Sequence, residues 1–218
     1  MLAVASQLFM ACGLVDFDLD DETPEAVEMH LNFDTVYVMV GDEFALSPEF
    51  TPDSVSNHEI YWTSSADSVV TAFNNTLYAL SEGEAMVSAL SVQNRISDSC
   101  YVYVMPRWEV ASGDYPHDMV VYAHVTVHGQ EPNENMLIGA FRGLECRGIG
   151  EWKEWQGKRY MQIRVYSEMM DDEDGVEERI RFLCYDRTIL QVETFPQRIN
   201  YDGGTHGSLS SLFELTIP

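Results

Sequence analysis

The segment Gly83-Glu84-Ala85-Met86-Val87-Ser88-Ala89 is the clearest indication of fold in the first half of this 218-residue chain. Its small apolar residues, Ala85, Val87 and Ala89, recur at every second position, which is the period of a strand with one buried face. Gly83 permits the turn that precedes them, because glycine adopts backbone conformations that other residues avoid. The segment therefore predicts a β-strand that directs these three residues into a core.

Short strand-like segments of the same kind follow one another from Val36 to Val104. They are rich in β-branched and aromatic residues, and turn residues separate them at intervals of about ten, which is typical of an antiparallel sandwich. Trp62 lies on one of these segments and supplies a large ring for a small core. We therefore expect Trp62 to be a core residue of an all-β domain.

Five motifs occur in a fixed order in this region. They are Val40-Gly41-Asp42-Glu43, Thr51-Pro52, Tyr61-Trp62-Thr63-Ser64-Ser65, Ser68-Val69-Val70 and Gly83 to Ala89. Together they resemble the group 2 bacterial immunoglobulin-like (Ig-like) domain. The resemblance implies an Ig-like domain over residues 28–105, of a type that acts as a spacer or adhesive module on bacterial surfaces.

The second half of the chain, Trp108 to Pro218, is also rich in strand-like segments. Between Met119 and Val127 apolar residues alternate with polar or aromatic ones, so we expect one buried face and one exposed face. His124 and His128 lie on the second face, but four residues along a strand span about 13 Å, which is too far for two ligands of one zinc ion.

Further motifs of this half stand in order along the chain. They are Tyr115-Pro116, Met119, Met136 to Phe141, Glu145-Cys146-Arg147-Gly148, Lys158 to Tyr166, Ile180 to Asp186 and His206-Gly207-Ser208. They resemble a β-sandwich domain that recurs in secreted and surface proteins of anaerobic gut bacteria. The resemblance implies a C-terminal sandwich over residues 106–218 and no defined activity. The predicted fold is therefore all-β, with two β-sandwich domains in tandem, the first Ig-like.

The N-terminal stretch Leu8-Phe9-Met10-Ala11-Cys12 closes an apolar segment with a cysteine. This pattern predicts a lipoprotein signal segment over residues 1–12, with Cys12 lipidated, because the signal peptidase cleaves before a diacylated cysteine. An acidic linker, residues 13–27, follows and resembles the export tag that sends lipoproteins of some gut anaerobes to the outer leaflet. No basic residue precedes Leu2, so an upstream start, or an apolar first strand or helix, is the alternative.

The apolar N-terminal stretch is too short for a transmembrane helix, which needs about 20 residues. The predicted location is therefore the outer membrane, with the protein lipid-anchored and exposed at the surface. The net charge of −24 excludes nucleic acid and anionic lipid as partners, because binding them depends on Lys and Arg. We expect membrane contact only through the lipid anchor, and a monomer.

Three cysteines follow Cys12, namely Cys100, Cys146 and Cys184, and we expect them to be free and buried. A bridge between Cys146 and Cys184 is the alternative, since they lie on different predicted strands. Glu145 and Arg147 are two residues apart and are expected to form a charge pair on one side of a strand. The functional alternative makes Cys146 a nucleophile whose pKa is lowered by Arg147.

Trp152 and Trp155, within a polar segment, are the candidate ligand-binding residues, because exposed tryptophans can stack on a sugar ring. Packing of both rings against the sheet is the alternative. The acidic segment Asp171 to Gly175 is interpreted as a solvated hairpin turn, with a calcium site as the alternative. Gly203 to Ser208 is interpreted as a turn before a final strand, Phe213 to Ile217.

These features predict a non-enzymatic surface lipoprotein whose second domain contacts an extracellular glycan or protein from an Ig-like spacer. No residue is predicted to be catalytic, and no metal or cofactor is expected. A carbohydrate-binding accessory protein of a polysaccharide-uptake system is the first alternative. A subunit that polymerises by strand exchange, or a hydrolase built from Cys146 and His206, are the others.

Overall fold

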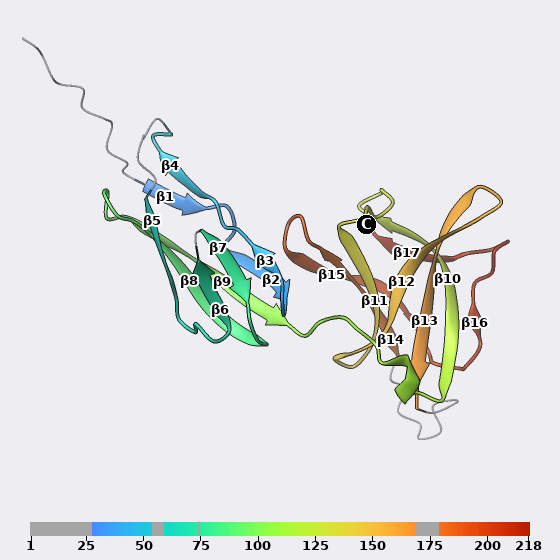
Figure 1. The fold of residues 1–218 in the computed structure, drawn as a ribbon. Helices are drawn as coiled ribbons and strands as arrows, with labels where there is room; N and C mark the ends of the chain where they lie inside the picture. The colour runs from blue at the N-terminus through green and yellow to red at the C-terminus, as the bar shows by residue number, and fades with distance from the viewer. Residues whose placement is uncertain (1–27, 54–58, 74, 169–178) are drawn as a thin grey trace, which may run out of the picture.

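The computed structural model describes residues 28–53, 59–73, 75–168 and 179–218. In this part the chain is almost wholly β-structure, arranged as two bodies that a single connecting segment joins (Figure 1). The predicted all-β fold class is confirmed, with two β-sheet domains in tandem. No helix in the described part has the length and hydropathy of a membrane span.

The first domain is built from three small sheets. Its strands are β1 (Glu28–Leu31), β2 (Thr35–Met39), β3 (Glu43–Phe44), β4 (Pro48–Thr51), β5 (Ile60–Ser64), β6 (Val70–Phe73), β7 (Thr76–Ala79), β8 (Gly83–Ser91) and β9 (Ser97–Met105). The largest sheet has the order β2-β9-β8-β5, with β2 parallel to β9. A second sheet has the order β3-β7-β6, and β1 pairs with β4.

The first core confirms the alternation predicted for β8. Ala85, Val87 and Ala89 are almost completely buried, and Cys100 of β9 lies opposite Val87 in the same core. Trp62 of β5 packs against this core from its edge and donates a hydrogen bond from Nε1 to Oδ1 of Asn75 at 3.1 Å. Trp62 is therefore a structural residue, as predicted, although its ring stays partly exposed.

The second domain is formed by one long sheet that folds over on itself. Its elements are η1, a 3-10 helix (Ser112–Asp114), and strands β10 (His117–Val127), β11 (Met136–Arg142), β12 (Glu145–Trp155), β13 (Lys158–Ser167), β14 (Ile180–Asp186), β15 (Gln191–Ile199), β16 (Thr205–His206) and β17 (Phe213–Ile217). The strand order is β15-β14-β11-β12-β13-β10-β16, and β17 also pairs with β10, in parallel.

The sheet folds along β12, which pairs with β11 through its first half and with β13 through its second. A register shift opposite Ala140 and Phe141 marks a bulge on this strand, and bulges increase the local bend and twist. Two glycines make the fold possible. A Cβ at Gly148 would overlap the carbonyl oxygen of Arg164, and one at Gly150 would overlap Sδ of Met161.

The second core lies inside this folded sheet. Met119, Val121, Ala123, Val125 and Val127 of β10 are all buried, so the alternation predicted for this strand is confirmed. Large apolar side chains from β13, β14 and β15 complete the core, including Ile163, Phe182 and Phe195. The opposite face of β10 and β13 remains outside, and there the polar side chains of these strands gather.

A third buried cluster joins the two domains. Met39 of β2 packs with Trp108, Phe141 and Tyr185, and the Trp108 ring meets the Phe141 ring edge-on at 4.9 Å. Trp108 lies in the segment between β9 and β10, so the connection between the domains is itself part of a hydrophobic core. We call these four residues, together with Asp42 and Leu190, the interdomain joint.

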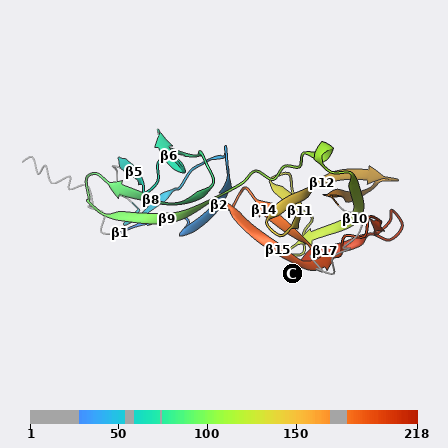
Figure 2. The same cartoon turned by 90° about the horizontal axis from the view of Figure 1, so that it is seen from below.

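The hairpin of β14 and β15 gives the joint its polar contacts, and both views place this hairpin beside β2 (Figures 1 and 2). Leu190 reaches into the core of the first domain, and its carbonyl accepts a hydrogen bond from the backbone N–H of Tyr37 at 2.8 Å. The Tyr185 hydroxyl donates to Oδ2 of Asp42 at 3.1 Å. The second domain therefore completes the core of the first.

Candidate functional site

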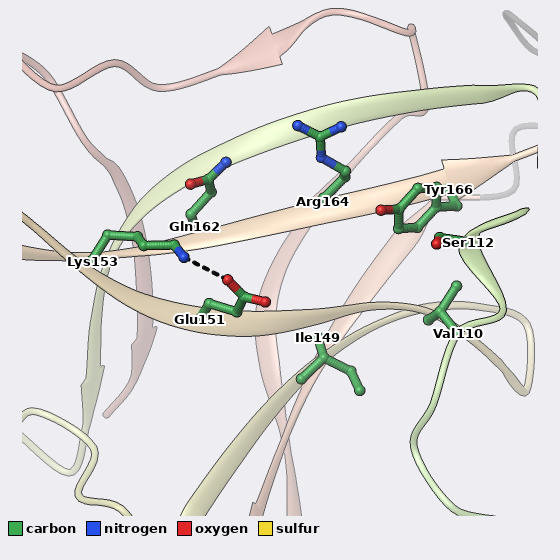
Figure 3. Close-up of a pocket in the computed structure, with 8 residues that line it drawn as sticks. All are labelled: Val110, Ser112, Ile149, Glu151, Lys153, Gln162, Arg164 and Tyr166. Carbon is green, nitrogen blue, oxygen red and sulfur yellow. Dashed lines mark ion pairs between the residues drawn. The ribbon is translucent and has the colours of Figure 1, made fainter.

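The strongest candidate site is an open cleft of about 360 Å³ on the outer face of β12 and β13 (Figure 3). Strands β12 and β13 supply most of its lining, and the segment before β10 covers one end. The lining residues are Val110, Ser112, Ile149, Glu151, Lys153, Gln162, Arg164 and Tyr166. We call this site the β12–β13 cleft.

Strand alternation places these side chains together. Met161, Ile163 and Val165 of β13 are buried in the second core, so Gln162, Arg164 and the residues in step with them point outward. In the neighbouring strand, Glu151 lies directly opposite Gln162 and so projects from the same face. The cleft is therefore a consequence of sheet geometry rather than of a special loop.

The charges along the cleft occur in pairs. Nζ of Lys153 lies 2.7 Å from Oε2 of Glu151, and Nη1 of Arg164 lies 3.4 Å from Oδ2 of Asp118 on β10 (Figure 3 shows the first pair). The hydrogen bond from Lys153 lowers the pKa of Glu151, and the same bond raises the pKa of Lys153. Both groups are therefore charged across the physiological range, and each pair offers a donor beside an acceptor.

Three of the other lining residues are apolar or aromatic. Ile149 and Val110 lie at one end of the cleft, and the Tyr166 ring stands near Ser112 (Figure 3). Tyr166 is supported from behind by Tyr115, with ring centroids 6.3 Å apart. The cleft thus combines hydrogen-bonding groups with a small apolar surface, as sites for polar small molecules generally do.

A charge cluster around the buried Arg147 holds the segment that covers the cleft. Nη2 of Arg147 lies 2.9 Å from Oε2 of Glu145, which confirms the predicted pair. Glu145 also accepts a 2.7 Å hydrogen bond from the Tyr115 hydroxyl, and the Arg147 guanidinium carbon lies 4.5 Å from the Tyr115 ring centroid. Because Tyr115 follows Val110 and Ser112 closely in the chain, this cluster helps to fix their position.

Trp152 and Trp155, the predicted ligand-binding residues, lie on opposite faces of β12, as their odd spacing requires. Trp152 packs against the second core, and the Arg159 guanidinium lies 4.3 Å from its ring centroid. Trp155 is 43% exposed and points to the face that carries the cleft, near the hairpin tip. The two rings therefore do not form one platform, and sugar binding by either remains a prediction.

All three cysteines of the described part are free, so the alternative of a bridge between Cys146 and Cys184 is wrong. Burial raises the pKa of Cys146 to about 11 and that of Cys184 to about 12. The nucleophile hypothesis required a lowered pKa at Cys146, and it is wrong for that reason. Arg147 does not activate the thiol, because its guanidinium pairs with Glu145.

His124 of β10 and His128, the residue after β10, secure the last strand. Nδ1 of His124 lies 2.9 Å from Oε2 of Glu214, and His128 contacts the Pro218 carbonyl at 2.7 Å and Glu193 at 3.0 Å. Among the residues with described positions, no group of three His, Cys, Asp or Glu side chains could hold a metal ion. Gly203 to Ser208 precedes β17, as predicted, and contains the short strand β16.

Three sequence-based predictions fall outside the described residues. They are lipidation of Cys12, the acidic linker over residues 13–27, and the turn or calcium site at Asp171 to Gly175.

The sequence reasoning did not identify the cleft, although one signal was present. Gln162, Arg164 and Tyr166 occupy alternate positions in a strand-like segment and therefore share a face. Nothing in the sequence indicates that Val110 and Ser112, about 50 to 56 positions earlier, would cover that face.

No protein-family model matches the chain, and no curated protein sequence matches it. Among solved structures, surface-layer protein SbsC domains 1–6 is similar at 14% identity and a TM-score of 0.34, over 81% of this chain and 26% of that chain. Human protocadherin-24 EC1-2 is similar at 9% identity and a TM-score of 0.31, over 88% of this chain and 98% of that one.

A glycan-binding protein is also among these structures. SGBP-B of the Bacteroides ovatus mixed-linkage glucan utilization locus, in complex with a mixed-linkage heptasaccharide, is similar at 13% identity and a TM-score of 0.25, over 83% of this chain and 48% of that chain. This chain spans only 26% of each of the first two structures it resembles, both of SbsC. At these TM-scores none of the likenesses assigns a family or a function.

Proposed function

We propose that the chain is a non-enzymatic cell-surface binding protein that contacts an extracellular glycan through the β12–β13 cleft. In this proposal the Ig-like domain is a spacer, and Cys12 carries a lipid anchor in the outer membrane. The identity of the bound glycan would decide between two roles, one in adhesion and one as the accessory protein of a polysaccharide-uptake system.

The composition of the β12–β13 cleft carries the proposal. A sugar ring needs groups that donate and accept hydrogen bonds at its edge and an apolar contact for its C–H face. Glu151, Lys153, Gln162 and Arg164 supply the first, and the Tyr166 ring supplies the second. The volume of about 360 Å³ lies within the range of about 300–1,000 Å³ that is common for small-molecule sites.

The interdomain joint supports the role of the first domain as a spacer. A spacer transmits the position of its anchor to the binding site only when the two domains are held together. Trp108, Tyr185 and Leu190 bury apolar surface between the domains, and backbone groups hydrogen-bond across them. The cleft opens beside the joint: Ile149 lines the cleft and packs against the apolar cluster of the joint, but no residue of the joint itself lines the cleft.

A glycan array with the full-length chain tests the binding function. We expect binding to a defined group of glycans, and loss of about 100-fold or more in affinity when Lys153 and Arg164 are both replaced by Ala, since each removed charged donor is worth about 1.5–3 kcal/mol. Arg95→Gln, which changes an exposed basic residue of the first domain, is the matched control. Binding that survives Lys153→Ala/Arg164→Ala unchanged would place the ligand elsewhere.

The anchor is tested separately in cells. We expect incorporation of labelled palmitate and recovery in the outer-membrane fraction, and loss of both with Cys12→Ala. A soluble, unlabelled wild-type protein would reject the anchor and leave the binding proposal standing.

A further inference from the structure

We propose, on the basis of the function proposed above, that the β12–β13 cleft selects an uncharged glycan and rejects uronic-acid and sulfated polymers. The reason is that the charged side chains lining the cleft are already paired with one another or with a neighbouring carboxylate.

Both cations that line the cleft already face a carboxylate. Lys153 is paired with Glu151 at 2.7 Å, and Arg164 with Asp118 at 3.4 Å. An anionic sugar would have to displace these carboxylates, and it would be repelled by them as it approached.

A sugar hydroxyl fits the same pairs without displacing them. A hydroxyl donates one hydrogen bond and accepts others, so it can donate to the Glu151 carboxylate while it accepts from Lys153. Carboxylate and sulfate groups of acidic sugars only accept, and they leave Glu151 without a partner. The side-chain amide of Gln162, which lies opposite Glu151, again offers a donor and an acceptor side by side.

The charge of the whole protein acts in the same direction. With a net charge of −24, the chain repels a polyanion over a distance comparable to the Debye length of about 10 Å at 0.1 M salt. An unpaired basic cluster would be needed to overcome that repulsion, and the cleft has paired charges instead. Neutral glycans are not subject to this penalty.

The experiment compares neutral and acidic polymers on the same protein. Dextran, xyloglucan and galactomannan are titrated against polygalacturonate and heparin by calorimetry, at 20 mM and 200 mM NaCl. We expect at least one neutral polymer to bind with an affinity that salt changes by less than about two-fold, and the acidic polymers not to bind.

The variant Glu151→Gln is expected to change the affinity for neutral and for acidic glycans in opposite directions. For a neutral glycan it removes a charged acceptor and is expected to weaken binding about ten-fold. For an acidic glycan it would release Lys153 and strengthen binding. Glu154→Gln is the matched control, because Glu154 is exposed on the same strand and points to the opposite face. We expect it to change affinity by less than about two-fold.

The possible results test the neutral ligand class separately from glycan binding itself. Tighter binding of acidic polymers, weakened by salt and strengthened by Glu151→Gln, would overturn the neutral ligand class while leaving glycan binding intact. Binding of neither class here, together with a blank glycan array, would overturn both. Neutral binding that is insensitive to Glu151→Gln would overturn the role of the charge pair.

Discussion

The interdomain joint and the β12–β13 cleft both contain residues from the segment that connects the two domains. This segment is buried at the joint, whereas at the cleft it borders an open space. At the joint, Trp108 is 7% exposed and packs against Phe141 and Tyr185. At the cleft, a few residues further on, Val110 and Ser112 line an open space beside paired charges. One stretch of chain thus closes an apolar contact and also borders a polar opening.

The difference shows how the protein can present a binding face without loosening its structure. The joint gains stability from buried apolar area, which contributes whether or not a ligand is present. The cleft holds groups that stay hydrated until a ligand replaces the water, so it contributes little to stability. Changes at the joint should therefore affect folding, whereas changes at the cleft should affect binding alone.

The largest expected effect is that of Trp108→Ala. Removing this buried ring should lower the free energy of unfolding by about 3–5 kcal/mol, because a cavity remains between the domains. Trp155→Ala, at a 43% exposed ring on the cleft side, should change it by only about 0.5 kcal/mol. Urea denaturation followed by circular dichroism measures both, and similar losses would erase the distinction between joint and cleft.

Cys146 packs against the apolar cluster of the interdomain joint, so the reactivity of its thiol measures how accessible this region is to solvent. With a pKa of about 11, its thiol is deprotonated at pH 8 in about one molecule in a thousand, against about one in ten at the ordinary value of 9.0. Alkylation by iodoacetamide, followed by mass spectrometry, should therefore be about 100-fold slower than in 8 M urea. Equal rates in native and denatured protein would contradict the burial of this residue.

Tyr185→Phe should have a smaller effect, because it removes the hydrogen bond to Asp42 and leaves the ring in place. We expect a loss of about 1–2 kcal/mol in the free energy of unfolding, since the acceptor is a carboxylate. Tyr160→Phe, on the outer face of β13, is the control for loss of a hydroxyl. The assignment fails if the control destabilises the protein as much as Tyr185→Phe does.

The smallest effect is expected from pH on glycan binding between about pH 5 and 9. The pKa of Glu151 lies below its ordinary value of 4.5 and that of Lys153 above 10.5, so both stay charged throughout this interval. Binding should fall only as the pH drops below 4.5 and Glu151 takes up a proton. A titration midpoint near pH 6 to 7, measured by calorimetry, would instead implicate a histidine.

The strands could be predicted well because alternation has a direct physical cause. Burial of β8 and β10 on one face followed from residues such as Val87 and Val121, which only need an apolar side chain at every second position. The Glu145–Arg147 pair followed from the same periodicity. The prediction that Trp152 and Trp155 bind one ligand together did not take this periodicity into account. Two residues three positions apart on a strand lie on opposite faces of the sheet.

Local side-chain periodicity was enough to predict the all-β class and the inward face of the long strands. Three contacts could be seen only in the folded chain: Leu190 completes the core of the first domain, Tyr185 reaches Asp42, and Val110 covers one end of the cleft on the outer face of β12 and β13. Those contacts join residues far apart in the chain. They depend on how the bulged strand β12 folds the sheet and on how the two domains meet, which no local pattern specifies.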